Sequence, residues 1–434
     1  MTGFVAGTAR ADITPPVGVD LCGYGARPGA STGVRDPLLA EALYLADGRC
    51  KLLILTCDLI GFHHDQVAAL RRGIEARTGV PAAHILVGCS HTHAGPATPC
   101  LKYLGNPDPA YLEGLLRTVM ATATVARERA QPAQAGWART ELRVGMNRRQ
   151  RCAGGMAIGV NEEGSTAPYV DVLVVNALDG GPLARLFSHA ANAVALGGDN
   201  TLISADWPGA ARRGIEAAAG GGAALFLQGC CGNLNCRERG DEGVESQGRA
   251  AAAAVLAAVA KAGLSERVTL GAALTPLDLP LAPPPPAAEA RALVAAARAK
   301  LAELPATANR GVRWMAEGAV EWSLDLLRLA EEGPRARTVP FAVQALRVGA
   351  GAIVGLPGEV FVEYALNLDR ASLFQPTLVA GYANGNVGYI PTAAAYPEGG
   401  YEVTDAIRYY GVTMPLPESE ALILAAARTA LSGV

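Results

Sequence analysis

The sequence predicts an α/β fold in which mixed β-sheets are flanked by helices. Short apolar runs of strand length alternate with segments of helical spacing. Near the start they follow the order strand, helix, strand, which is typical of a crossover between parallel strands. A proline run at 283–286 marks a boundary, and the helical segments after it predict a helical hairpin inserted into the α/β chain. The 434 residues are enough for one large domain or two ordinary ones.

The elements before this boundary are predicted from apolar periodicity and from turn residues. The expected strands are 40–45, 52–59, 84–87, 170–177, 183–188 and 223–227. The expected helices are 65–77, 109–130, 210–218 and 243–262. Beyond the boundary we expect helices over 287–304 and 312–332, followed by strands at 339–348 and 352–356 that resume the sheet.

Composition excludes some classes of function. The formal net charge is −3, so no excess of basic residues indicates nucleic acid or an anionic membrane. The first residues contain no basic leader followed by an apolar run, and no window approaches the ~18 apolar residues of a membrane span. We therefore expect a cytoplasmic protein without a membrane span. Its nine cysteines are then expected to be free thiols.

Histidine is scarce, and two of the six histidines lie two positions apart. His91 and His93 follow the apolar run at 84–87. In extended backbone such residues point to the same side, toward the cleft that forms where strands of an open sheet end. Neutral imidazole is a good zinc ligand. On this motif alone, a zinc site and a polar loop with hydrogen-bonded histidines are equally favoured.

Other polar residues at strand ends are weaker candidates. His189 ends a predicted strand, where a lone histidine is more often structural than a ligand. Glu359 follows Pro-Gly, so it is either a helix-start residue or a metal ligand. His63 and His64 are adjacent, and adjacent residues on a strand face opposite sides, so the pair is a poor chelate. The cysteines at 230–236 lack the CxxC spacing of a structural zinc site and are expected to be small buried thiols.

Five segments, in a fixed order, carry a family resemblance. They are 11–15 with 23–24; 90–96; 146–149; 188–189 with 203–206; and 357–359 followed by 388–392 and 398–402. His-Thr-His-Ala-Gly-Pro at 91–96 and Gly-Tyr-Ile-Pro-Thr at 388–392 are together quite specific. With these segments the chain resembles the catalytic domain of neutral (alkaline, non-lysosomal) ceramidases over nearly its whole length.

The resemblance implies a zinc ion held by two histidines, a glutamate and a tyrosine. The matching residues are His91, His189, Glu359 and Tyr389. It also implies that three residues, His93, Arg148 and Tyr401, bind the substrate carbonyl or oxyanion and take part in catalysis.

The chain departs from the family at the segment that carries the family's catalytic serine. Family members have Gly-Asp-x-Ser-Pro, whereas this chain has Gly-Asn-Leu-Asn-Cys, with Asn233 in place of the aspartate and Asn235 in place of the serine. Asn235 cannot act as an acid or base, but its amide can orient water or substrate. The chain is also expected to lack the signal peptide and the C-terminal immunoglobulin-like domain of the secreted members. A single ceramidase-like catalytic domain over 1–434, with a helical insertion at 283–332, is expected.

These features predict a zinc-dependent hydrolase that cleaves the amide bond of a small acyl-amide substrate other than ceramide, using a zinc-activated water. One alternative is a zinc enzyme that cleaves an ester or forms an amide or lactam. A second is a degenerate member that binds a ligand without chemistry. The sequence leaves the substrate, the oligomeric state and the physiological metal open.

Overall fold

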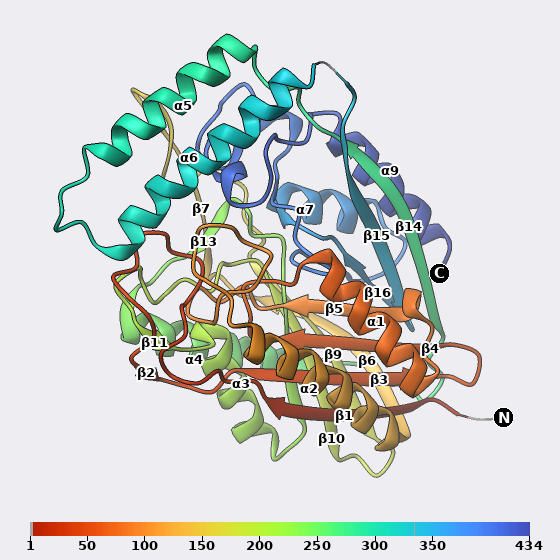
Figure 1. Ribbon diagram of the computed structural model, residues 1–434. Coiled ribbons are helices and arrows are strands. Elements are labelled where there is room, and N and C mark those ends of the chain that lie inside the picture. Colours follow the sequence, from red (N-terminus) through yellow and green to blue (C-terminus); the bar gives the residue numbers. More distant parts are fainter. Residues whose placement is uncertain (1–2, 334) are drawn as a thin grey trace.

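The computed structural model describes residues 3–333 and 335–434. Two β-sheets pack face to face, and helices cover the outer face of each sheet (Figure 1). The predicted class, mixed α/β with a helical insertion, is confirmed. Among the described residues, no helix is both long enough and apolar enough to cross a membrane.

The larger sheet has eight strands. In spatial order they are β12 (Ala223–Gln228), β10 (Pro182–His189), β9 (Tyr169–Ala177), β6 (Gln131–Glu141), β1 (Val5–Asp12), β3 (Leu39–Ala46), β4 (Lys51–Cys57) and β5 (Ile85–Cys89). Only β10–β12 and β4–β5 are parallel. Helix α1 (His64–Thr78) connects β4 to β5, which confirms the crossover predicted from the sequence.

Helices cover the outer face of this sheet. They are α1, α2 (Pro109–Glu128), α3 (Asp206–Ala219) and α4 (Gly240–Val259). Helix α1 buries Val67, Leu70 and Ile74, which lie three or four positions apart and therefore share one face. It ends at Gly79, whose φ of 65° is a left-handed conformation that glycine adopts without strain.

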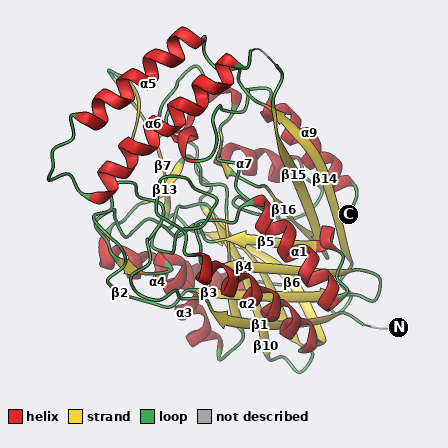
Figure 2. Cartoon of the chain, in the orientation of Figure 1, coloured by secondary structure: helices red, strands yellow, loops and turns green. Residues whose placement is uncertain are grey.

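The smaller sheet has four strands, and its inner face packs on the larger sheet. Its strands are β14 (Leu270–Pro280), β15 (Thr338–Val348), β16 (Gly351–Gly355) and β18 (Thr377–Ala380). Leu346 and Ile353 from this sheet share one buried core with Leu45 and Ile54 of the larger sheet. Helices α7 (Val362–Ala371) and α9 (Ser419–Ser432) pack on the outer face (Figure 2).

Short elements complete the structure. A three-stranded sheet contains β13 (Leu234–Cys236), β7 (Gly145–Cys152) and β8 (Gly155–Asn161). Two-stranded ladders join β2 (Gly33–Val34) to β11 (Leu202–Ile203) and β17 (Glu359–Val360) to β19 (Tyr389–Ile390). Helix α8 (Tyr401–Thr404) follows, and 3₁₀ turns lie at Ala82–His84, Ala393–Ala395 and Ala406–Tyr409.

The predicted helical hairpin is present as α5 (Ala287–Ala302) and α6 (Arg310–Glu331), which lie side by side at one end of the molecule (Figure 1). The start of α6 packs closely on the loop at 25–27. A Cβ added at Gly311 would lie 2.4 Å from the carbonyl oxygen of Gly25, so only glycine allows this contact. Arg310 adds an ion pair to Asp20 at 2.9 Å.

Several strands had no signal in the sequence. Strands β1 and β6 consist largely of alanine, glycine and polar residues, and therefore do not form an apolar run. Strand β14 was missed as well, although it pairs with β15 over its whole length. Pairing with neighbouring strands, which comes from distant parts of the chain, determines these elements.

A buried ion cluster joins α3 to the larger sheet. Arg212 donates hydrogen bonds to Glu41 at 3.0 Å and to Asp58, and all three side chains are buried. Burial raises the pKa of Glu41 to about 7, although Arg212 acts against this shift. The guanidinium therefore compensates two carboxyl groups that have lost their contact with water.

We expect Arg212→Met to lower the free energy of unfolding by about 3–5 kcal/mol, because it leaves these carboxyl groups without a counter-charge. The loss should be larger at pH 8 than at pH 5. A carboxyl whose pKa is raised in the folded state destabilises the fold as pH rises through that pKa. Urea denaturation at both pH values measures the free energy of unfolding of the variant and the wild type. The control is Arg213→Met, whose exposed arginine should contribute less than about 1 kcal/mol. Equal losses for the two variants would contradict the prediction.

Candidate functional site

Residues 380–383 connect the two edges of the larger sheet. Strands β5 and β12 stand at opposite ends of the strand order, yet they contact one another because the sheet curves. Gly88 of β5 pairs with Ala383, and Gly229, directly after β12, pairs with Ala380. The carboxyl ends of β5, β10 and β12 therefore meet in one region, which is where open α/β sheets bind ligands.

His91 lies in a turn just after β5. Its φ is 57°, so the extended backbone expected for the His-x-His motif is wrong, and a left-handed turn orients the side chain instead. Nδ1 lies 2.6 Å from the carbonyl oxygen of Ile60. A carbonyl can only accept, so Nδ1 carries the proton and Nε2 keeps its lone pair, 3.6 Å from the Glu359 carboxylate. Burial lowers the pKa of His91 to about 3, and the ring is therefore neutral at pH 7.

Glu359 lies at the centre of a group of tyrosines. In the β17–β19 ladder it pairs directly with Tyr389, so these two residues are neighbours across the strands. The Tyr382 hydroxyl donates to Glu359 Oε2 at 3.4 Å, and the Tyr410 hydroxyl donates to Oε1. The Tyr382 ring also stacks on the His91 ring, with centroids 3.9 Å apart. Burial raises the pKa of Glu359 to about 7.

His189, the last residue of β10, has the same tautomer as His91. Its Nδ1 lies 2.8 Å from the carbonyl oxygen of Tyr169, so Nε2 is again the acceptor nitrogen, and this Nε2 accepts the Gly145 N–H at 3.2 Å. Burial lowers its pKa to about 4. In the described part of the chain, the candidate ligand atoms of His91, Glu359 and His189 do not all lie within 4.8 Å of one another.

A different group of side chains does meet this 4.8 Å spacing. Over residues 3–333 and 335–434 it is the only such group, and it consists of His63, His64 and Asp65. The expectation that adjacent histidines point apart is wrong here, because the pair lies at the start of α1 and not on a strand. Their rings lie 3.8 Å apart. The cluster is on the surface, with Asp65 80% and His64 66% exposed at the side chain.

His93 has a buried ring whose two nitrogens have no hydrogen-bond partner among the described residues. The ring lies 4.9 Å from the His91 ring and 5.0 Å from the Tyr24 ring. Gly23 makes room for it, since a Cβ there would lie 2.4 Å from the imidazole, and its φ of 100° also favours glycine. Burial lowers the pKa of His93 far below its usual range, so the ring is neutral and both nitrogens are available to a ligand.

Arg148 on β7 is fixed by three side chains. It donates to Glu402 at 2.9 Å, to the Tyr389 hydroxyl at 2.9 Å and to the Asn235 side-chain oxygen at 3.3 Å. Arg148 is 6% exposed and Glu402 is 1% exposed, so the ion pair is shielded from water. The guanidinium is thus a rigid positive charge, and its link to Tyr389 connects it to Glu359.

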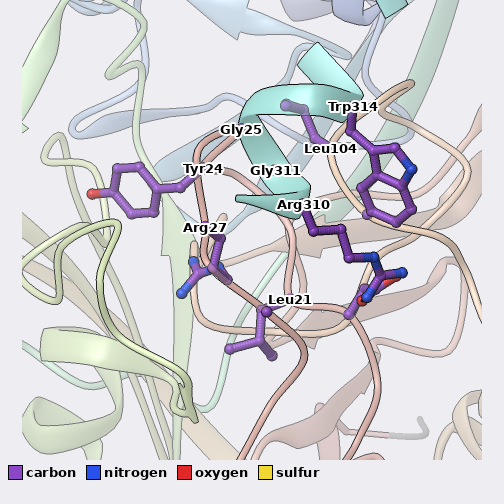
Figure 3. A pocket seen from close by; sticks show the side chains of 11 residues that line it. Leu21, Tyr24, Gly25, Arg27, Leu104, Arg310, Gly311 and Trp314 are labelled. Carbon is purple, nitrogen blue, oxygen red and sulfur yellow. The ribbon is translucent and has the colours of Figure 1, made fainter. Parts of the chain in front are cut away.

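A cavity of about 470 Å³ opens beside these groups. His93, Arg148, Asn235, Tyr389 and Tyr401 all line it. A second, adjoining cavity lies between the start of α6 and the loop at 21–29 (Figure 3). It holds only about 20 Å³, room for about one water molecule, so the larger cavity is the candidate substrate site.

The structure thus brings together His91 with Glu359, and His93 with four other expected residues around the cavity. His189 lies beside β7 with its Nε2 engaged by Gly145. Sequence reasoning missed three residues of this site. Glu402 was within a quoted motif but had no role, and Tyr382 and Tyr410 had no sequence signal.

Two further groups near the site have structural roles. The carboxylate of Asp206, from the motif segment at 203–206, accepts the backbone N–H groups of Ala195 and Leu196 at 3.1 and 2.9 Å. All nine cysteines are free, as expected. Burial raises the pKa of Cys231 to about 12, so this thiol is not a nucleophile at neutral pH.

The architecture is similar to that of solved ceramidases. A ceramidase in complex with C2 matches with a TM-score of 0.74 at 17% identity, over 100% of this chain and 75% of the other. The neutral ceramidase from Pseudomonas aeruginosa matches with a TM-score of 0.71 at 18% identity, over 100% and 74% respectively. Neither a family model nor a curated protein matches the sequence. The chain therefore has a ceramidase-like fold.

Proposed function

We propose that the protein is a zinc-dependent hydrolase that cleaves the amide bond of a small acyl-amide substrate other than ceramide. The observation that carries the proposal is an arrangement just behind the cavity wall: the neutral His91, whose Nε2 faces the buried carboxylate of Glu359. Next to it, the fixed Arg148 and His93 line the cavity, and the ring nitrogens of His93 have no hydrogen-bond partner among the described residues. The ceramidase-like fold and the motifs at 91–96 and 388–392 support an amide substrate.

His91, His189, Glu359 and Tyr389 would hold the zinc ion. Both histidines are neutral and donate Nδ1–H to a backbone carbonyl, which is the usual way in which a zinc-binding imidazole is oriented. Nitrogen and oxygen donors of this kind suit zinc. His189 would exchange its Gly145 contact for the metal. When bound, zinc polarises a carbonyl and makes water more acidic.

The residues of the chain would then bind the substrate and move protons. Arg148 is positioned to stabilise negative charge on the carbonyl oxygen, because its guanidinium lines the cavity and is already held in place. The two ring nitrogens of His93 have no hydrogen-bond partner in the described part of the chain, and the hydroxyl-bearing Tyr401 lines the same cavity. The Tyr401 hydroxyl can deliver a proton to the leaving amine, and the neutral His93 ring can do so after it has taken one up from the attacking water.

Asn235 distinguishes this site from that of the ceramidase family. Its side-chain oxygen accepts from Arg148 at 3.3 Å, and no hydroxyl stands at this position. The amide can orient substrate or water, but it cannot take up a proton at neutral pH. This replacement is the reason to propose a substrate other than ceramide.

Metal removal tests the proposal. We expect the zinc-loaded protein to hydrolyse members of a panel of N-acyl amides, to lose at least about 100-fold in rate after dialysis against a chelator, and to recover when zinc is added. Amine release measured by fluorescence gives the rate. Turnover that persists in zinc-free protein would contradict the proposal. Substrate binding without turnover by the zinc-loaded protein would favour a ligand-binding member instead.

The loss of the family serine also motivates a second candidate, a zinc enzyme that cleaves esters or forms amides or lactams. Reaction in ¹⁸O-labelled water separates the possibilities. Amide hydrolysis places the label in the released carboxylate, whereas amide formation does not incorporate it. Ester analogues of the same panel show whether the site prefers the oxygen leaving group.

A further inference from the structure

The substrate cavity contains more positive charge than the proposed chemistry requires. Besides Arg148, which is paired with Glu402, two further arginines line it: Arg408 and Arg239. Among the described residues, one acidic side chain lines the cavity, that of the exposed Asp199. The charge that faces a ligand is therefore positive.

Arg408 is the more informative of the two arginines. It is half-buried, and its Nε has lost its contact with water and has no hydrogen-bond acceptor among the described residues. Over the same residues, no carboxylate lies within ion-pair distance of its guanidinium. The group lies 5.0 Å from the Tyr409 ring, and Tyr409 and Tyr401 line the same cavity. Removing a charged donor from water without a partner is unfavourable, so this position suits a ligand that brings an acceptor.

Two other arginines near the cavity show how this chain compensates a buried guanidinium. Arg148 and Arg149 are both buried, and both are paired with Glu402. Arg408 lies a few positions along the chain from that glutamate, yet within 3–333 and 335–434 it has no carboxylate partner of this kind. Arg239 is exposed and donates to the backbone carbonyl of Val194, another residue of the lining, so it adds further positive charge to the cavity.

The remaining lining is largely apolar. Leu104, Ile158 and Met315 contribute aliphatic or thioether surface, and Met315 comes from α6 of the helical insertion. A ligand that fits this cavity combines an apolar part, an amide near Arg148 and an anionic group near Arg408. A carboxylate matches a guanidinium well, because its two oxygens can accept two parallel N–H bonds.

We propose that the substrate is a carboxylate-bearing acyl amide, and that Arg408 binds the carboxylate. This inference rests on the proposed amide hydrolysis and specifies the substrate class for that same site. The carboxylate is on the amine part, as in an N-acyl amino acid, or on the acyl part, as in the monoamide of a dicarboxylic acid. Both place the same anion a short distance from the scissile bond.

Two pairs of compounds test this inference. N-octanoylglycine is compared with neutral N-octanoylethanolamine, and N-octyladipamic acid with its neutral methyl ester. Calorimetry on zinc-free protein gives the binding constants without turnover, and kcat/KM on zinc-loaded protein gives the specificity. In at least one pair we expect the acid to be favoured over its neutral partner by about tenfold or more, the factor that one charge-assisted hydrogen bond supplies.

The variant Arg408→Met should remove most of this preference, so that the acid-to-neutral ratio falls by about tenfold. Arg72→Met is the matched control, because it removes the same charge from an exposed position on α1 outside the cavity lining. The ratio in this control should equal that of the wild type. Rescue of the ratio by Arg408→Lys would identify charge as the cause.

Each result separates the inference from the proposed function. If neutral and anionic partners bind and react equally in both pairs, the inference is wrong and amide hydrolysis stands. A preference for the acids that survives in Arg408→Met also contradicts it. If binding shows the preference but no amide is cleaved by zinc-loaded protein, anion recognition stands and the proposed hydrolysis is wrong.

Discussion

Replacing His91 with alanine is expected to abolish zinc binding and amide turnover in a protein that remains folded. His91 Nε2 is unprotonated and faces the Glu359 carboxylate at 3.6 Å, so it is the nitrogen best placed to bind the metal. Loss of a residue that only supports a metal ligand lowers affinity about 10- to 100-fold, and loss of the ligand itself should cost more. Mass spectrometry of the metal, kcat/KM, and circular dichroism measure zinc, activity and fold.

His64→Ala is the matched control. It removes a histidine from the exposed cluster formed with His63 and Asp65, where zinc can bind adventitiously. We expect this variant to keep one zinc ion per chain and wild-type turnover. Full zinc content in His91→Ala, or loss of the catalytic zinc in His64→Ala, would show that the metal site proposed here is wrong.

The second large effect is expected for Arg148→Lys, with a loss of about 10²–10³-fold in kcat and little change in zinc content. Lysine keeps the positive charge, but its single ammonium cannot reproduce the planar set of bonds to Glu402, Tyr389 and Asn235. Steady-state kinetics of the variant on the best amide of the panel, together with its zinc content, measure the effect.

Arg149→Lys is a suitable control for this experiment. Arg149 is the next residue on β7 and also bonds Glu402, at 2.8 Å, but it does not line the substrate cavity. We expect Arg149→Lys to lose much less kcat than Arg148→Lys. Comparable losses in the two variants would mean that Arg148 acts only by holding Glu402, and would remove its assigned role at the carbonyl oxygen.

The sequence predicted the strands and helices whose apolar residues are continuous or periodic. The crossover through α1 and the hairpin α5–α6 are examples. It missed β1 and β6, which contain few large apolar side chains, and β14, whose leucines are separated by small and polar residues and by proline. All three strands are stabilised by pairing with neighbours. Local pattern cannot reveal an element whose main stabilisation comes from distant segments.

The same distinction holds for the candidate site. Motifs identified His91, Glu359 and Tyr389, and the structure places these residues around one point. The curvature of the larger sheet and the segment at 380–383 assemble that point, and neither is encoded locally. Tyr382 and Tyr410 reach Glu359 only through this assembly, so no spacing in the sequence could indicate them.

His189 shows that residue type alone does not establish a metal ligand. Its tautomer fits a zinc ligand, yet its Nε2 accepts the Gly145 N–H. Metal binding therefore requires this nitrogen to leave a backbone donor at 3.2 Å, a long and weak hydrogen bond. The small cost of breaking such a bond is compatible with the proposed ligand set.

The most direct measurement is anomalous diffraction at the zinc absorption edge from crystals of the zinc-loaded protein. We predict one strong peak about 2.0–2.1 Å from the Nε2 atoms of His91 and His189, with Glu359 and Tyr389 as the oxygen ligands. A peak confined to His63, His64 and Asp65, or no peak in protein that hydrolyses amides, would contradict the account.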